Sequence, residues 1–289
     1  MKRFCRVTAT IVLPIIAILL CSLPAMAAET KDSRCASGIT VIAHRGTGNG
    51  TVMLRGKKYS EDTVPSAVIA VRLGACGREY DLQISRDHVL FVHHDPTVDR
   101  MTRGHGPIKQ HLASWVRRWR NPDGSPIATF GALLRAAVLA GGYHQQEFKP
   151  FGFADSDLQY AMTLNHKYIA DERLVLRTSS QTHILCKLDA IDRQYMKDNP
   201  DDQFDGYANG LINFNPRGRF NLTKVNDNCV DVLMLNILAL DRAYVRAAHK
   251  AGFEVSARSV NTVAAFRRVK AWGVDRVVTD KPWILRGRR

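Results

Sequence analysis

Carboxylates in unfavourable places are the first chemical signal in this chain. It contains only six glutamates, and two of them, Glu79 and Glu147, fall in strand-like segments. A carboxylate there costs free energy unless it is paired or bound to a metal ion. Asp81 follows Glu79 by two residues and so points to the same face of its strand. The sequence therefore predicts that Glu79, Asp81 and Glu147 form one acidic site.

Two histidines are predicted to join these carboxylates. His44 ends the first strand-like segment, at the same rim. Only three residues separate the segments Glu79–Ser85 and Val89–His94, too few for a parallel crossover, so these segments must form an antiparallel hairpin. A turn centred between Asp87 and His88 makes cross-strand partners sum to 175, which places His94 opposite Asp81 on the same face.

This set of side chains suits few metal ions and few reactions. Three carboxylates without cysteine or a closely spaced histidine pair favour Ca²⁺ or Mg²⁺ over zinc. Two imidazoles beside such an ion are suited to act as general base and general acid. Arg45 and Lys149 supply the positive charge that attracts an anionic phosphodiester. The residues thus predict metal-assisted phosphodiester cleavage.

A barrel is the fold that brings these residues together. Strand-like runs alternate with helical stretches, as in a parallel sheet covered by helices. One of the nine runs is the second arm of the hairpin, so eight parallel strands remain, and we predict an α/β fold, a (β/α)8 barrel with a hairpin above its second strand. The nine runs are Thr40–Gly46, Glu79–Ser85, Val89–His94, Gln145–Lys149, Leu174–Ser179, Gly210–Phe214, Val230–Asn236, Phe253–Val260 and Val274–Asp280.

Two further helices and two loops are predicted outside the strands. Asp241–Ala251 is predicted to be a helix, and Asn261 is expected to cap a second helix over Thr262–Trp272 that Gly273 ends. Residues 47–60 and 196–228 are expected to be loops.

Residues 1–27 have the layout of a secretory signal peptide. Basic residues precede an apolar stretch, and Ala25-Met26-Ala27 provides a cleavage site. Cleavage leaves a single domain over residues 28–289, without stable membrane insertion, exported to a periplasm or secreted. The alternative is that Val7–Leu23 stays as a short membrane anchor. Cleavage would leave four cysteines, enough for two disulfides in three possible connectivities: Cys35, Cys76, Cys186 and Cys229.

Composition limits the possible partners. The hydrophobic fraction of 45% and charged fraction of 24% exclude disordered, collagen-like and coiled-coil classes. Loss of the three basic residues of the signal lowers the net charge from +14 to +11, which still favours acidic partners. The basic residues form no run interleaved with aromatics, so nucleic acid is not expected. A small phosphate-bearing substrate is the expected partner, and the oligomeric state stays open.

Several motifs together resemble the glycerophosphodiester phosphodiesterase family. The resemblance implies a barrel of the phosphatidylinositol-phospholipase-C-like type that hydrolyses glycerophosphodiesters to glycerol 3-phosphate and an alcohol. It assigns His44 and His94 as the acid/base pair, Arg45 and Lys149 to the phosphate, and Glu79, Asp81 and Glu147 to the metal. The motifs run in family order from about residue 40 to 285: Ala43-His44-Arg45-Gly46, Glu61-Asp62-Thr63, Glu79-Tyr80-Asp81, His94-Asp95, Asp99-Arg100, Glu147-Phe148-Lys149-Pro150, Gly273-Val274-Asp275 and Thr279-Asp280-Lys281-Pro282.

Some residues depart from the family pattern. The 47–60 loop is longer than usual, Asp62 replaces an Asn, and Arg258 stands where a Trp usually lines the substrate pocket. Arg258 is therefore a candidate substrate-binding residue, unless it pairs with Glu254 or with an aspartate of a loop.

Nearby polar residues are given structural roles. His88, His93 and His249 are expected to be structural, and Asp95 and Asp280 to order loops or neighbouring side chains. Glu61 is expected to cap the first helix, with contact to the site as the alternative.

Two other functions remain open. A phospholipase-D-like enzyme acting on intact or lyso-lipids, with a cyclic phosphate product, would need an exposed apolar lip near Met53 and Leu54. The third hypothesis is a non-catalytic barrel that binds phosphate-bearing ligands. The presence of both His44 and His94 argues against it.

Overall fold

The computed structural model describes residues 38–150, 152–225 and 228–285. The predicted signal peptide and Cys35 lie outside these residues.

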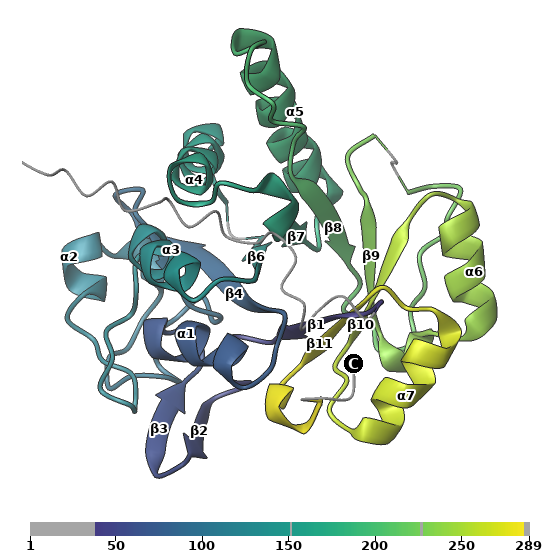
Figure 1. The fold of residues 1–289 in the computed structure, drawn as a ribbon. Helices are drawn as coiled ribbons and strands as arrows, with labels where there is room; N and C mark the ends of the chain where they lie inside the picture. Colours follow the sequence, from purple (N-terminus) through teal and green to yellow (C-terminus); the bar gives the residue numbers. More distant parts are fainter. Residues whose placement is uncertain (1–37, 151, 226–227, 286–289) are drawn as a thin grey trace, which may run out of the picture.

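Eight parallel strands close into a barrel (Figure 1). The barrel closes because β1 pairs with β11 on one side and with β4 on the other. This confirms the predicted (β/α)8 fold. The strands are β1 (Thr40–Ala43), β4 (Gly77–Ile84), β6 (Tyr143–Phe148), β7 (Val175–Ser179), β8 (Ala208–Ile212), β9 (Val232–Asn236), β10 (Glu254–Arg258) and β11 (Arg276–Thr279).

Helices surround the barrel, and local sequence signals explain their ends. Thr63 caps α1, Asp241 caps α6 by accepting from the Tyr244 backbone N–H, and Gly273 ends α7 with a φ of 85°. The main helices are α1 (Val64–Arg72), α3 (Phe130–Leu139), α4 (Asp155–Tyr168), α5 (Thr182–Asp198), α6 (Arg242–Lys250) and α7 (Val263–Trp272). Short helical turns are η2 (Ile108–Gln110), α2 (Ala113–Val116), η3 (Glu172–Leu174), η4 (Ile237–Ala239) and η5 (Pro282–Leu285).

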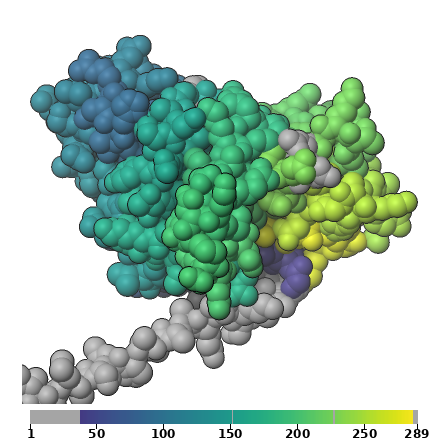
Figure 2. Space-filling model, turned by 90° about the horizontal axis from the view of Figure 1, so that it is seen from above, coloured from purple at the N-terminus to yellow at the C-terminus, as the bar shows by residue number. Residues whose placement is uncertain are grey.

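Seen from above, α5 lies between the part of the chain coloured blue and teal and the part coloured yellow (Figure 2). No helix among the described residues is both long and apolar enough to cross a membrane.

Alternation along the strands divides the core into layers. Val41, Val255 and Val277 face outward from the barrel. They belong to the hydrophobic cluster that also contains the buried residues of α6 and α7. Their neighbours Ile42 and Val278 belong to a separate cluster of strand residues. Because successive strand residues point to opposite faces, these apolar strands bury both faces.

The predicted hairpin exists, but its register differs from the prediction by one residue. In the ladder between β4 and β5 (Leu90–Val92), Leu82 pairs with Val92 and Ile84 with Leu90. Cross-strand partners therefore sum to 174, and the His93 N–H, not that of His94, donates to the Asp81 carbonyl at 2.9 Å. The physical reason is a three-residue loop that ends in His88 with a φ of 60°, where the prediction assumed two residues.

The expectation of a plain loop over residues 47–60 is wrong. β2 (Thr51–Leu54) and β3 (Lys57–Ser60) form a two-stranded hairpin that projects from the barrel (Figure 1). Its turn consists of Arg55 and Gly56, both with positive φ, which suits a tight hairpin. The 196–228 segment is also not a loop throughout, because α5 runs to Asp198 and β8 begins at Ala208.

One disulfide joins α5 to the segment before β9, between Cys186 and Cys229. Cys76 is likewise disulfide-bonded. Both agree with the expected structural use of cysteine in this chain.

Candidate active site

The three predicted carboxylates meet at one end of two neighbouring strands. Glu79 and Asp81 lie on β4 and Glu147 on β6, and Asp81 is the direct parallel partner of Glu147. One oxygen from each lies within 4.8 Å of the others. All three residues are buried, none more than 6% exposed.

Burial of like charges makes this cluster unfavourable without a further cation. Burial, followed by the charges of Asp81 and Glu147, raises the pKa of Glu79 well above its usual value. Glu79 Oε1 also has no hydrogen-bond partner among the described residues. This all-oxygen donor set, with its unpartnered Glu79 oxygen, fits a hard divalent cation such as Ca²⁺ or Mg²⁺.

Two basic residues compensate the cluster in part. Lys149 Nζ lies 2.8 Å from Asp81 Oδ1 and 2.5 Å from Glu147 Oε1. Arg45 Nε lies 3.2 Å from Asp81 Oδ2, and the Arg45 backbone N–H donates to Glu79 Oε2 at 2.8 Å. Although burial opposes it, the charges of Lys149 and Arg45 lower the pKa of Asp81. Two cations against three carboxylates leave a net negative charge.

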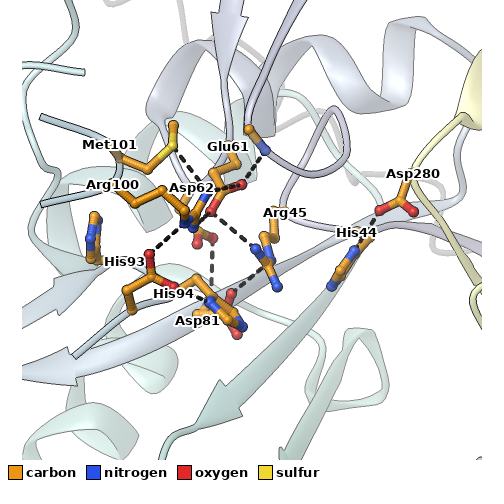
Figure 3. A network of polar contacts seen from close by, with 12 residues as sticks. His44, Arg45, Glu61, Asp62, Asp81, His93, His94, Arg100, Met101 and Asp280 are labelled. Atoms are coloured by element: carbon orange, nitrogen blue, oxygen red, sulfur yellow. Dashed lines mark hydrogen bonds and ion pairs between the residues drawn. The ribbon is translucent and has the colours of Figure 1, made fainter. Parts of the chain in front are cut away.

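His44 is held on one side of the cluster. Its Nε2 lies 3.9 Å from Glu79 Oε2, and its Nδ1 lies 2.6 Å from Asp280 Oδ1 (Figure 3). Asn261 fixes this carboxylate, since its Nδ2 donates to Asp280 Oδ2 at 2.6 Å and its Oδ1 accepts from the Asp280 backbone N–H at 2.8 Å. Burial raises the pKa of Asp280, but the hydrogen bonds from His44 and Asn261 outweigh it, so the pKa is lowered. An ionised Asp280 keeps the proton of His44 on Nδ1 and leaves Nε2 facing the carboxylates.

The structure confirms that Asp280 orders a neighbouring side chain. It corrects the role of Asn261, which was expected to cap α7. Thr262 is the cap, and its hydroxyl accepts from the Ala265 backbone N–H. Asn261 instead positions Asp280, a contact between residues 19 positions apart.

His94 approaches the cluster from the hairpin side. Figure 3 shows His94 beside Asp81, so it reaches the cluster despite the shifted register. Its Nδ1 lies 2.7 Å from Asp95 Oδ1. Burial lowers the pKa of His94, which favours the neutral imidazole. His93, by contrast, is buried with its Nε2 3.0 Å from the Thr97 carbonyl, as its expected structural role requires.

The expectation that Glu61 caps the first helix is wrong. Thr63 provides the cap, and buried Glu61 accepts from Arg45 Nη1 at 3.0 Å and from Arg100 Nη2 at 2.5 Å. Burial raises the pKa of Glu61, but the hydrogen bond from Arg100 and the charge of Arg45 outweigh it and lower the pKa. Glu61 therefore fixes the Arg45 guanidinium beside Asp81 (Figure 3).

Asp62 is a site residue whose role was not predicted. It is 3% exposed, and its Oδ1 accepts from the Asp81 backbone N–H at 3.2 Å. Burial and the charges of Asp81 and Glu79 raise its pKa well above the usual value. A protonated Asp62 has the shape and neutrality of the Asn that it replaces. The replacement itself was the only signal in the sequence.

Arg258 stands apart from the acidic cluster. It ends β10, and its guanidinium lies 4.9 Å from the centre of the Phe214 ring. The alternative pairing with Glu254 is wrong, because Glu254 accepts from Arg276 Nε at 2.8 Å.

The two remaining histidines with expected structural roles contact carboxylates, His88 that of Asp157 and His249 that of Asp275.

Comparisons with known proteins agree with this arrangement. The model of the glycerophosphoryl diester phosphodiesterase family matches residues 44–188. A putative glycerophosphodiester phosphodiesterase of Bacillus subtilis is 24% identical over 253 residues, which cover 84% of this chain and 94% of the relative. A glycerophosphodiester phosphodiesterase of Caldanaerobacter subterraneus is 38% identical over 78 residues, but these span only 27% of this chain and 29% of the relative.

Solved structures show the same fold. A phosphodiesterase of Oleispira antarctica, in complex with its product sn-glycerol-3-phosphate, superposes with a TM-score of 0.70 at 20% identity and covers 84% of this chain and 94% of that one. A putative glycerophosphodiester phosphodiesterase of Galdieria sulphuraria gives a TM-score of 0.69 at 17% identity, with 86% and 96% covered.

Proposed function

The chain belongs to the glycerophosphoryl diester phosphodiesterase family, and from this we propose that it hydrolyses glycerophosphodiesters to glycerol 3-phosphate and an alcohol. The observation that carries the proposal is the buried, undercompensated trio Glu79, Asp81 and Glu147 with one histidine on each side.

The substrate phosphate is bound by the positive groups beside the trio. Lys149 Nζ and the Arg45 guanidinium are buried and already fixed by carboxylates, so little side-chain entropy is lost when the phosphate binds. A divalent cation held by Glu79, Asp81 and Glu147 would offset the charge on the phosphate oxygens.

Proton transfer is assigned to the two histidines. Asp280 orients His44 so that Nε2 is available for a proton, and Asp95 does the same for His94. One imidazole takes a proton from the attacking oxygen, and the other gives a proton to the leaving alcohol. A substrate with a very acidic leaving alcohol needs no general acid, so it should rescue only the variant, His44→Ala or His94→Ala, that lacks the acid.

Phosphorus NMR of the products tests this function. Purified protein is incubated with glycerophosphocholine, glycerophosphoethanolamine, lysophosphatidylcholine and sphingomyelin, with Ca²⁺, with Mg²⁺ and with excess chelator. We expect glycerol 3-phosphate from the first two substrates, no turnover in chelator, and a bell-shaped dependence of rate on pH. Full activity in chelator would contradict the metal assignment, and wild-type rates in both histidine variants would contradict the acid/base assignment.

A second candidate substrate class is favoured by the β2–β3 hairpin. Its side chain Met53 is 59% exposed, and Arg55, Lys57 and Lys58 are exposed around it. An apolar residue among basic ones suits contact with an anionic lipid surface. Cleavage of lysophosphatidylcholine or sphingomyelin in the same assay, with a cyclic phosphate resonance, would support phospholipase-D-like activity.

Arg258 and Phe214 are proposed to contact the alcohol part of the substrate. Both lie at the carboxyl ends of barrel strands, where barrel active sites are found. The Arg258 charge should favour anionic or polyol head groups over choline. In Arg258→Trp, the ratio of kcat/KM for glycerophosphoglycerol over glycerophosphocholine should fall several-fold. An unchanged ratio would place Arg258 outside the substrate site.

Export to a periplasm or to the medium is proposed as the location. The Cys186–Cys229 disulfide supports it, because such bonds persist in oxidising compartments. Mass spectrometry of the protein from an expressing cell should find the first residue at position 28, and a retained segment 1–27 would contradict cleavage.

A further inference from the structure

A second group of arginines lines a cleft on the segment between β5 and α3. The cleft has a volume of about 650 Å³. Its described lining holds four arginines and no acidic residue: Arg100, Arg103, Arg118 and Arg120, with Met101, Thr102, Trp119, Asn121, Pro122 and Gly124. Only Arg100 among them is ion-paired, so three positive charges share this cleft without a counter-charge among the described residues.

Two of the four arginines in this cleft have no acceptor in the described parts of the chain. The side chains of Arg103 and Arg118 are exposed and make no hydrogen bond or ion pair within the part of the chain that the structure describes. Arg120 Nη1 donates only to the backbone carbonyls of Arg117 and Trp119, at 2.8 and 3.1 Å. The cleft therefore presents an excess of guanidinium donors, the complement of an anion with several oxygens.

The scaffold around these donors is well packed. Trp119 packs edge-to-face on Trp115, with ring centroids 5.5 Å apart. A Cβ at Gly104 would collide with the Trp119 indole, so the backbone at Gly104 lies directly against this ring. The loop after Trp119 is tied to the β2–β3 hairpin, because Asp123 Oδ2 accepts from the Ser60 backbone N–H at 3.0 Å. The donors are thus presented from a fixed surface.

Arg100 separates this cleft from the acidic cluster. Its Nη2 lies 2.5 Å from Glu61 and its Nε 2.5 Å from Asp95, whereas the other three arginines of the cleft make no such ion pair. Figure 3 shows Arg100 beside Glu61, with Arg45 on the other side of that carboxylate. The cleft and the site of hydrolysis are therefore neighbouring but distinct.

We propose that this cleft binds a phosphate group, with Arg103 and Arg118 as its donors. A guanidinium presents two parallel N–H groups that match two phosphate oxygens. The ligand is a small phosphate ester or the phosphate of an anionic lipid head group. This inference goes beyond the proposed hydrolysis and does not depend on it.

Calorimetric titration with glycerol 3-phosphate, in the presence of Mg²⁺, tests the proposal. The protein is compared with the double variant Arg103→Gln/Arg118→Gln and with Arg135→Gln, an exposed arginine on α3 outside the cleft. We expect the double variant to bind one molecule fewer per chain, or to bind it at least about tenfold more weakly. Arg135→Gln should bind like the wild type.

Activity and vesicle binding complete the test. kcat/KM for glycerophosphocholine should stay within about twofold in the double variant, since neither of the two arginines touches the reacting phosphate. Sedimentation with phosphatidylglycerol vesicles, against phosphatidylcholine vesicles, identifies the source: binding that the double variant loses assigns the site to lipid head groups, and binding to glycerol 3-phosphate alone assigns it to soluble esters. An unchanged stoichiometry and affinity in the double variant, or a parallel fall in kcat/KM, would overturn the proposal.

Discussion

Two groups of buried charges in this barrel differ in how far their charges are balanced and their hydrogen bonds are made. In the first, Arg177 of β7 is 1% exposed and meets Asp192 of α5 through both terminal nitrogens, at 2.8 and 2.6 Å. Its Nε donates to Asn209 Oδ1 at 3.0 Å, and the Tyr207 backbone N–H donates to Asp192 Oδ2 at 3.0 Å. This group is neutral as a whole and fully hydrogen-bonded, as expected of a structural ion pair.

The second group lies on β4 and β6. It is not neutral, and some of its oxygens lack a hydrogen-bond partner among the described residues. Glu79, Asp81 and Glu147 outnumber Lys149 and Arg45, and buried Asp62 adds a further carboxyl group with an unpartnered Oδ2. Folding alone gives no reason to keep such a cluster, because its charged form is unfavourable. The contrast agrees with a structural role for the first group and with the binding and catalytic role proposed for the second.

The largest effect should follow from a change in the acidic cluster. Glu79→Gln should lower kcat by about 10²- to 10³-fold or more, because it removes a cation ligand and a charge beside the phosphate. The free energy of unfolding, measured by urea in chelator, should not fall, since burial already disfavours the Glu79 charge. Glu254→Gln, exposed and paired with Arg276, is the control and should change neither quantity. A large loss of stability in Glu79→Gln would place this residue with the structural charges.

The opposite result is expected at the structural pair. Asp192→Asn leaves the Arg177 charge buried without a partner and should lower the free energy of unfolding by about 3–5 kcal/mol. kcat of the folded protein should stay unchanged. Asp189→Asn on the same helix, which loses only an i,i+4 pair with Arg193, should cost about 0.5 kcal/mol. Equal urea midpoints for the two variants would contradict the structural role of the Arg177 group.

The two histidine partners offer a smaller contrast within the site. Asp280→Asn should lower kcat by about 10²-fold and shift the pH–rate profile, while KM stays unchanged, because the Nδ1 proton of His44 loses its charged acceptor. Asp95→Asn should have the smaller effect, because the His94 side chain is 32% exposed against 12% for His44 and so is held less by its surroundings. A fall in stability without a change in the pH profile would show that Asp280 has only a structural role.

The smallest expected effect is a change of stability with pH at His144. Burial, then the charge of Arg78, lowers the pKa of His144 well below 6.5. Below pH 6.5 the unfolded chain therefore binds a proton that the folded chain does not, so the free energy of unfolding falls as the pH drops. One such histidine contributes at most about 1.4 kcal/mol per pH unit.

Urea unfolding between pH 7 and 5 measures this slope. His144→Gln should reduce it by up to one proton, and His105→Gln, with a side chain that is 85% exposed, should not. The slope should not vanish, because burial also lowers the pKa of His93 and His94. Equal slopes for His144→Gln and the wild type would contradict the lowered pKa.

The barrel and its acidic trio were predictable because both follow from local patterns. Alternating strands and helices fix the order of the elements, and the two-residue period of a strand places Glu79 and Asp81 on one face. Glu147 follows because β6 is the next parallel strand in the sheet.

The positioning residues were not predictable in the same way. Contacts from Glu61 to Arg100 and from Asn261 to Asp280 depend on how loops fold back, which no local period encodes. The hairpin register failed for a different reason: a loop of two residues and one of three are equally compatible with the sequence between Ser85 and Val89, yet they shift every cross-strand pair.

The excess negative charge of Glu79, Asp81 and Glu147 predicts a metal site. Calorimetric titration of the chelator-treated protein with Ca²⁺ and with Mg²⁺, in wild type and in the variant Glu79→Gln/Glu147→Gln, measures it. We predict one bound ion per chain in the wild type and none in the double variant. No binding to the wild type at millimolar ion, or equal binding by both proteins, would contradict a metal site at these carboxylates.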